Sequence, residues 1–162
     1  MLSSSVDGAV TQMTAALDVL DTTDLSALNA DELIRLAGRC ETLARRHAVL
    51  AADIALEARR RDPAEVGGAP LKVLADWLRI TPAHARRRAT LAEPLTARRT
   101  LDGQPLPPHR PATAEAWRAG HLDTEHLRVI DHFFTELPTQ IRPTQHQHAE
   151  PVLAGHAREL RP

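Results

Sequence analysis

The sequence predicts an all-α protein, a bundle of several helices in a single domain over residues 1–162. Apolar residues make up 43% of the composition but aromatic residues only 2%, with no tyrosine, so a core would consist mainly of Ala, Leu, Val and Ile. Strand-rich domains usually contain more β-branched and aromatic side chains. Apolar residues also recur every three or four positions along most of the chain, the period of an amphipathic helix, and no segment is predicted as a strand.

The N-terminal segment is predicted to be one amphipathic helix with a cap at Ser3, Ser4 or Ser5. Its apolar positions alternate in steps of four and three, and they are Val6, Val10, Met13, Leu17 and Leu20. Such spacing places all five side chains on one face of a helix.

A second, long helix is predicted over about residues 31–61. Asn29 followed by Glu32 is an Asn variant of the capping box, just ahead of a periodic apolar run. At about 1.5 Å per residue, 30 residues span roughly 45 Å, and so long a helix needs a partner along its length. The first helix or the same helix of a second copy could supply it. The predicted self-association stripe is Leu33, Leu36, Cys40, Leu43, His47, Leu50 and Ile54. Within it, Cys40 is expected to be buried and unreactive, and His47 to be a packed or hydrogen-bonded core residue.

Shorter helices follow. Asp62-Pro63 and Gly67-Gly68 indicate a loop before a helix that starts near Pro70. Thr81 as N-cap, with Pro82 at the first helical position, begins the next helix.

The C-terminal part of the chain continues this pattern. Residues 101–111 contain four prolines and a glycine and are predicted to be a loop or extended crossover. The helix after it ends at Gly120, Asp123 caps another, and a last helix from about Thr144 contains Pro151, which can kink it.

Residues 72–93 have the outline of a helix-turn-helix, because a short turn separates two helices and the second carries three consecutive arginines. In that motif the second helix enters the major groove of duplex DNA. The predicted DNA-contacting residues are Arg79, His84, Arg86, Arg87 and Arg88. The alternative, a solvated helical face, stays open. Residues 112–137 repeat the outline, but the second helix of this pair is nearly neutral. Packing of apolar side chains explains this pair better than DNA binding does.

Charge is distributed unevenly although the formal net charge is only −1. Residues 1–34 contain six acids and no base, whereas residues 71–100 contain seven bases and two acids. Such asymmetry permits a nucleic-acid-binding patch, and it is equally explained by mutual neutralisation of the two stretches across the fold.

No reaction centre is predicted from the residue types. Cys40 is the single cysteine, and the nine histidines lack the spacing of a zinc site. There is no nucleophile elbow and no phosphate-binding glycine loop. We therefore expect no catalysis, metal, cofactor or small-molecule substrate. The N-terminus lacks the features of a signal peptide and no stretch approaches a membrane span, so a cytoplasmic location without a membrane partner is expected.

Three stretches together resemble a known family. They are Trp77 to Pro82 with Arg86 to Arg88, then Leu106-Pro107-Pro108 with Pro111-Ala112-Thr113, and then Ala119-Gly120-His121-Leu122 with Glu125-His126. In this combination, and over nearly all of residues 28–160, the chain resembles domain of unknown function 222, which occurs in mycobacterial and wider actinobacterial 13E12 repeat proteins.

The resemblance implies an association with nucleases. Family members commonly join this helical domain to a C-terminal HNH nuclease module built on paired histidines, an asparagine and often zinc-binding cysteine pairs. No position of this sequence matches that module, so no nuclease residue can be assigned and the resemblance implies an N-terminal portion of a longer protein. Three functions follow as hypotheses: a duplex-DNA-binding or nuclease-positioning accessory, a self-association module that forms a homodimer, and a truncated remnant with no independent activity.

Overall fold

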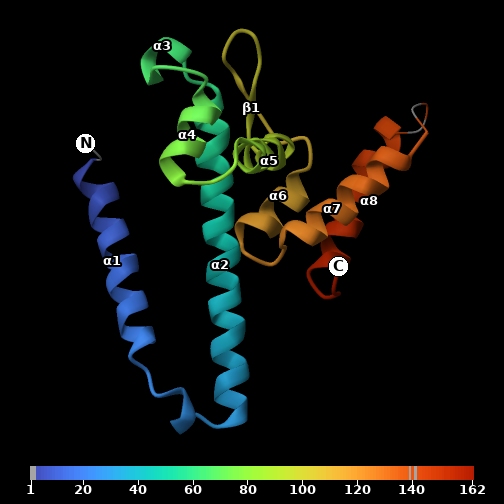
Figure 1. Cartoon of the computed structure of the whole chain (residues 1–162). Coiled ribbons are helices and arrows are strands. Elements are labelled where there is room, and N and C mark those ends of the chain that lie inside the picture. The colour runs from blue at the N-terminus through green and yellow to red at the C-terminus, as the bar shows by residue number, and fades with distance from the viewer. Residues whose placement is uncertain (1–2, 139, 141) are drawn as a thin grey trace. The chain divides into compact units, whose positions relative to one another are not determined.

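The computed structural model describes residues 3–138, 140 and 142–162, with the backbone alone for 142–147, and consists mainly of helices (Figure 1). This confirms the all-α prediction. The elements in chain order are α1 (Ser4–Asp21), η1 (Leu25–Ala27), α2 (Ala30–Arg59), α3 (Pro63–Val66), α4 (Pro70–Leu78), α5 (Pro82–Ala92), η2 (Glu93–Leu95), β1 (Arg98–Arg99), β2 (Pro105–Leu106), α6 (Pro111–Arg118), α7 (Thr124–Glu136) and α8 (Arg142–Ala157). The chain divides into two compact units, Met1–Arg39 and Cys40–Pro162, and α2 contributes residues to both.

In the first unit, α1 is amphipathic as predicted, but none of its residues is buried. Ser3 is the N-cap residue by backbone conformation, and its side chain makes no capping hydrogen bond. The five side chains of the predicted apolar stripe are between 38% and 64% exposed. Within the first unit, the apolar face of α1 is therefore left uncovered.

The start of α2 confirms the predicted capping box. The Asn29 side-chain oxygen accepts hydrogen bonds from the N–H groups of Asp31 and Glu32, both at 3.0 Å. The Glu32 carboxylate in return accepts the Asn29 N–H at 2.9 Å. These contacts satisfy donors that the first turn of a helix leaves without intrahelical partners.

The predicted stripe on α2 is mostly exposed, which corrects two expectations. Cys40 and His47 are both exposed rather than buried. The reason is that the buried residues of α2 in the second unit are Val49, Ala52, Ala55 and Leu56. At about 100° per residue these lie on the other side of the helix from the stripe. Among the stripe residues, Leu36 is half-buried and Leu33, Leu43, Leu50 and Ile54 are exposed.

The core of the second unit lies where α5, α6, α7 and α8 meet the C-terminal half of α2. Helix α5 contributes an entirely alanine face, Ala85, Ala89 and Ala92, each of which is fully buried. Small side chains there permit close approach to neighbouring elements. The largest fully buried side chains of the unit are Trp117, Phe134, Leu56, Leu95, Leu122 and Thr113.

Two segments differ from the sequence prediction of a helix-only chain with loops at 62–68 and 101–111. Strands β1 and β2 pair antiparallel, with Arg98 opposite Leu106. Each strand has two residues, too few for any alternation pattern to be visible in the sequence. The predicted loop after α2 contains the single-turn α3, capped by Asp62, whose carboxylate accepts the Ala64 N–H at 2.8 Å.

Both predicted helix pairs are present. The turn between α4 and α5 contains Arg79 in the left-handed conformation (φ 55°), followed by Thr81, whose hydroxyl accepts the His84 N–H at 3.1 Å. The turn between α6 and α7 contains Gly120 (φ 82°) and the N-cap Asp123. The last helix, α8, continues through Pro151.

Candidate functional site

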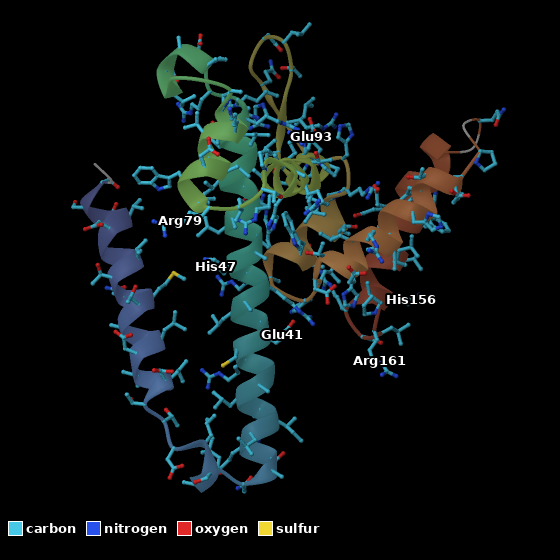
Figure 2. All side chains as sticks on the ribbon, in the orientation of Figure 1. Glu41, His47, Arg79, Glu93, His156 and Arg161 are labelled. Atoms are coloured by element: carbon cyan, nitrogen blue, oxygen red, sulfur yellow. The ribbon has the colours of Figure 1, made fainter. Side chains whose placement is uncertain are left out.

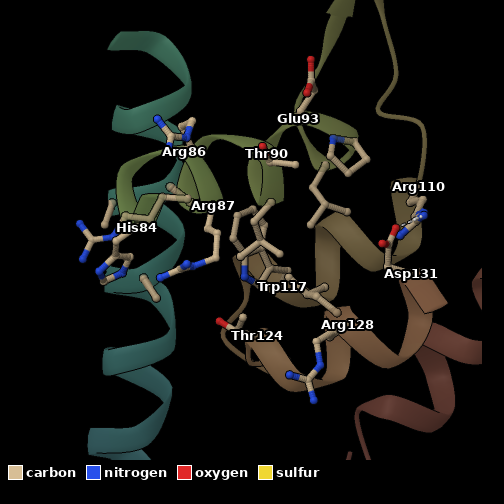
Figure 3. A pocket seen from close by; sticks show the side chains of 18 of the residues that line it. His84, Arg86, Arg87, Thr90, Glu93, Arg110, Trp117, Thr124, Arg128 and Asp131 are labelled. Atoms are coloured by element: carbon tan, nitrogen blue, oxygen red, sulfur yellow. Dashed lines mark hydrogen bonds and ion pairs between the residues drawn. The ribbon is translucent and has the colours of Figure 1, made fainter. Parts of the chain in front are cut away.

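A hollow of about 1070 Å³ lies beside α5 in the second unit (Figure 3). We call it the basic groove. Helix α5 forms one wall, α6 and α7 contribute to another, and α2 residues complete it. The residues that line it are His47, Ala48, Ala51, Ala52, Ala83, His84, Arg86, Arg87, Arg88, Thr90, Leu91, Glu93, Pro94, Leu95, His109, Arg110, Trp117, Thr124, Leu127, Arg128 and Asp131.

Four of the five predicted DNA-contacting residues line the basic groove. They are His84, Arg86, Arg87 and Arg88. Arg79 does not line it and lies at the end of α4. In Figure 3 the Arg86 and Arg87 side chains extend from α5 in different directions. Three consecutive residues of a helix point in different directions, as their spacing predicts.

The orientation of α5 follows from its sequence. Its alanine face is buried, so the polar residues between the alanines must lie on the opposite face. Arg86 and Arg87 are exposed and Arg88 is half-buried. Capping by Thr81 fixes the first turn of this helix.

Positive charge in the basic groove is only partly neutralised. Its two acids are already engaged: Glu93 contacts Arg59 at 2.9 Å, and Asp131 contacts Arg110 at 2.7 Å. Among the residues that the structure describes, none forms an ion pair with Arg86, Arg87 or Arg88. Three neighbouring guanidinium groups therefore remain available to an anionic ligand.

Sequence reasoning missed several cationic or imidazole side chains of the basic groove: Arg110, Arg128, His47 and His109. A signal for Arg128 existed. In each helix pair a histidine stands three residues after the N-cap and an arginine five residues after it, which gives Thr81, His84 and Arg86 in the first pair. The second pair repeats the pattern with Asp123, His126 and Arg128.

The N-cap of α7 shows how the second wall is held. The Asp123 carboxylate accepts the N–H groups of Glu125 at 2.8 Å and His126 at 3.0 Å, and lies 2.8 Å from the His126 ring. Burial raises the pKa of Asp123, but these backbone hydrogen bonds and the His126 ring outweigh it and leave the pKa below its usual value. The other ring nitrogen of His126 lies 3.0 Å from the Leu160 carbonyl oxygen, which ties α7 to the C-terminal residues.

Within the described part of the chain, no three His, Cys, Asp or Glu side chains cluster as a metal ion would require. Nor does any described helix combine the length and apolar character needed to cross a membrane. Cys40 is a free, exposed thiol on α2 (Figure 2 shows the side chains of that helix, with His47 labelled).

Comparison with known proteins identifies relatives for the whole chain. An uncharacterized protein of Mycobacterium tuberculosis is 39% identical over 172 residues, an alignment that covers 100% of this chain and 37% of the relative. An uncharacterized protein of Mycobacterium bovis is 36% identical over 164 residues, covering 99% of this chain and 35% of that protein. The chain thus spans about a third of the length of these curated relatives. No solved structure gives a significant match.

A family model extends this result. The model described as domain of unknown function (DUF222) matches residues 34–162, which include most of α2 and all of the basic groove. The match agrees with the resemblance carried by the two helix pairs. The chain belongs to the DUF222 family.

Proposed function

We propose that this chain is a non-catalytic DNA-binding module that holds DNA in the basic groove and positions it for a catalytic module elsewhere in a longer protein. The observation that carries the proposal is that Arg86, Arg87 and Arg88 line one hollow and form no ion pair with any residue that the structure describes. Arginine is suited to phosphate because its planar guanidinium donates two parallel hydrogen bonds. The positioning role follows from the association with HNH nuclease modules that the resemblance implies.

Fluorescence anisotropy tests DNA binding by the groove. The probe is a labelled duplex with a single-stranded tail, which offers both forms of DNA. Three arginines that contact phosphates release about three counterions, so affinity should fall by about 10–100-fold between 50 and 200 mM salt. Replacement of Arg86, Arg87 and Arg88 by alanine should abolish most of the binding and most of the salt dependence.

The matched control is R60A/R61A/R158A. It removes the same number of positive charges from residues that do not line the basic groove. Arg60 and Arg158 form exposed ion pairs, with Glu57 at 3.2 Å and Glu115 at 3.4 Å, whose loss costs little stability. Wild-type affinity in this control, with lost affinity in the α5 variant, supports the proposal. No binding at low salt, or equal loss in both variants, contradicts it.

A second candidate function, self-association with another copy of the chain, is favoured by the exposed apolar faces of α1 and α2. A contiguous exposed apolar surface commonly marks a protein interface. The charges beside the two faces are complementary, because α1 contains three acids and no base, while Arg39 and Arg46 beside the α2 stripe have no ion-pair partner among the described residues. We propose that these faces pack between two copies.

Sedimentation equilibrium tests this second candidate. We expect a dimer at tens of micromolar for the wild type and a monomer for Leu50→Glu, because a carboxylate on the stripe cannot be buried without a partner. Val152→Glu is the control: Val152 is 56% exposed on α8, against 51% for Leu50, and lies outside the stripe. A monomeric wild type at high micromolar concentration contradicts the proposal.

A further inference from the structure

The basic groove has protein on both sides of the helix face that was predicted to read DNA. The outward face of α5 carries Ala83, Arg87 and Thr90. The same hollow is lined by His47 and Ala51 from α2. From α6 and α7 it is lined by Trp117, Thr124, Leu127, Arg128 and Asp131. Helix α5 therefore forms one wall of a concave site.

This concave setting is unfavourable for duplex DNA. The major groove is about 12 Å wide and about 8.5 Å deep, and a helix with its side chains is about 10–12 Å across. A recognition helix therefore fills the major groove, so it must project from the protein with no other protein segment close on either side. Residues of α2, α6 and α7 line the same hollow as α5, so protein surrounds this face of the helix. Only a thinner ligand can reach the arginines from inside the hollow.

Guanidinium groups line the hollow from more than one element. Arg87 comes from α5, and Arg128 comes from α7 (Figure 3). The Arg128 side chain is 76% exposed and its partner Glu125, at 2.9 Å, is a neighbour on the same exposed helix surface. Such an exposed ion pair contributes little free energy, so Arg128 can exchange Glu125 for a phosphate at little cost. A phosphodiester backbone that follows the groove can thus meet cations along both walls.

Much of the remaining lining is apolar. Ala48, Ala51, Ala83, Leu91 and Pro94 are half-buried or exposed within the hollow. In a duplex the faces of the bases stack on one another, so they cannot pack on such a surface. Unpaired bases expose their faces, which pack on apolar side chains and on the planes of arginine and histidine.

The size of the hollow agrees with a short single strand. Its volume of about 1070 Å³ is slightly above the range of about 300–1,000 Å³ typical of sites for small organic ligands. A site of that size accepts a few linked nucleotides. It is too small to enclose the two backbones and paired bases of a duplex turn.

We infer that the basic groove binds single-stranded nucleic acid in preference to duplex, with phosphates on Arg87 and Arg128 and bases over the apolar lining. This inference deepens the proposed function and depends on it. It also assigns a ligand contact to α7. This is the second helix of the pair at residues 112–137, for which the sequence analysis gave packing as the better explanation.

Three labelled probes of one sequence test the inference by anisotropy: an eight-nucleotide DNA strand, the RNA strand, and a blunt hairpin duplex that exposes no unpaired stem bases. We expect at least tenfold tighter binding of a single strand, DNA or RNA, than of the blunt duplex. Equal or tighter binding of the duplex overturns the inference. Loss of binding to all three probes instead contradicts the proposed function, so the two failures are distinguishable.

Variants of Arg128 test where the bound nucleic-acid strand lies in the basic groove. Arg128→Ala should weaken single-strand binding about 5- to 20-fold, and Arg128→Lys, which keeps the charge, should restore part of it. Because Arg128 is an exposed surface residue, both variants should keep the wild-type circular dichroism spectrum and melting curve. Arg158→Ala is the control outside the groove. Unchanged affinity in Arg128→Ala, or equal loss in Arg158→Ala, overturns the placement.

Discussion

Gly120 illustrates how one residue positions a wall of the basic groove. Its φ of 82° lies in the left-handed region, and a Cβ built there would be 2.7 Å from the Thr42 carbonyl oxygen on α2. The turn between α6 and α7 can approach α2 this closely because glycine has no side chain. Arg45 holds the same turn by donating to the His121 carbonyl oxygen at 2.8 Å.

Replacing Gly120 by alanine should destabilise the protein by about 2–4 kcal/mol, because left-handed strain and a backbone clash add together. The matched control is Gly103→Ala, where φ is 88° but nothing lies within 4 Å of the added Cβ. It should cost only the strain, about 1–2 kcal/mol. Urea unfolding measures both variants, and equal losses would contradict the account of a close approach.

Asp123 makes stability depend on pH. Its burial raises the pKa, but hydrogen bonds from His126 and Glu125 lower it by more, and the result is a pKa below the usual value. A carboxyl with a lowered folded-state pKa stabilises the protein above its unfolded pKa of about 3.9, and this contribution disappears as the pH falls through the folded value.

The variant Asp123→Asn keeps an N-cap of similar quality but cannot ionise. We expect it to be less stable than the wild type at pH 7, and the difference to be smaller at about pH 2, because the stabilisation from ionised Asp123 decreases as the pH falls. Free energies of unfolding from urea titrations at the two pH values give the comparison. A difference that persists or grows in acid would show that ionisation of Asp123 is not the cause.

At the scale of elements, α6 depends on a carboxylate from α8. Glu150 is only 3% exposed, and its oxygens accept the Thr113 N–H at 2.6 Å and the Ala112 N–H at 3.4 Å. A negative charge at the first turn of a helix is favourable, because the free N–H groups and the helix dipole are positive there. The contact therefore fixes α8 against the start of α6.

Glu150→Ala should destabilise the protein by about 2–3 kcal/mol, because it leaves buried N–H groups without an acceptor. Glu150→Gln retains one acceptor oxygen and should lose less. The exposed Glu159→Ala is the control and should change stability by less than about 0.5 kcal/mol. Chemical denaturation measures all three, and a Glu150→Ala midpoint within error of the Glu159→Ala midpoint would be incompatible with this role.

The elements were largely predictable from local sequence. Asn29 with Glu32, Thr81 with Pro82, and Asp123 each predicted a helix start that the structure contains, because capping depends on neighbours in the chain. The two-residue strands were missed because they are too short to show an alternation pattern and because Pro105 lies in a proline-rich segment. Helical elements with strong caps are predictable, and strands of two residues are not.

At the scale of the whole molecule, burial and the site were less predictable. Periodicity placed His47 and Cys40 on one face of α2 but could not show which face the core covers, and both are exposed. The arginine run on α5 was visible in the sequence. That Arg87, Arg110 and Arg128 line the same hollow depends on how α5, α6 and α7 pack. Residue types were therefore predictable, and their convergence was not.

The proposed ligand-binding groove is formed by α5, α7 and α2 together. The most direct test is a titration of the ¹⁵N-labelled protein with the eight-nucleotide DNA strand, followed by amide chemical shifts. The account predicts that shifts concentrate in residues 47–52, 83–91 and 124–131, while the amides of α1 and the residues after 155 remain unchanged. Shifts confined to α1, or spread evenly over the surface, would contradict it.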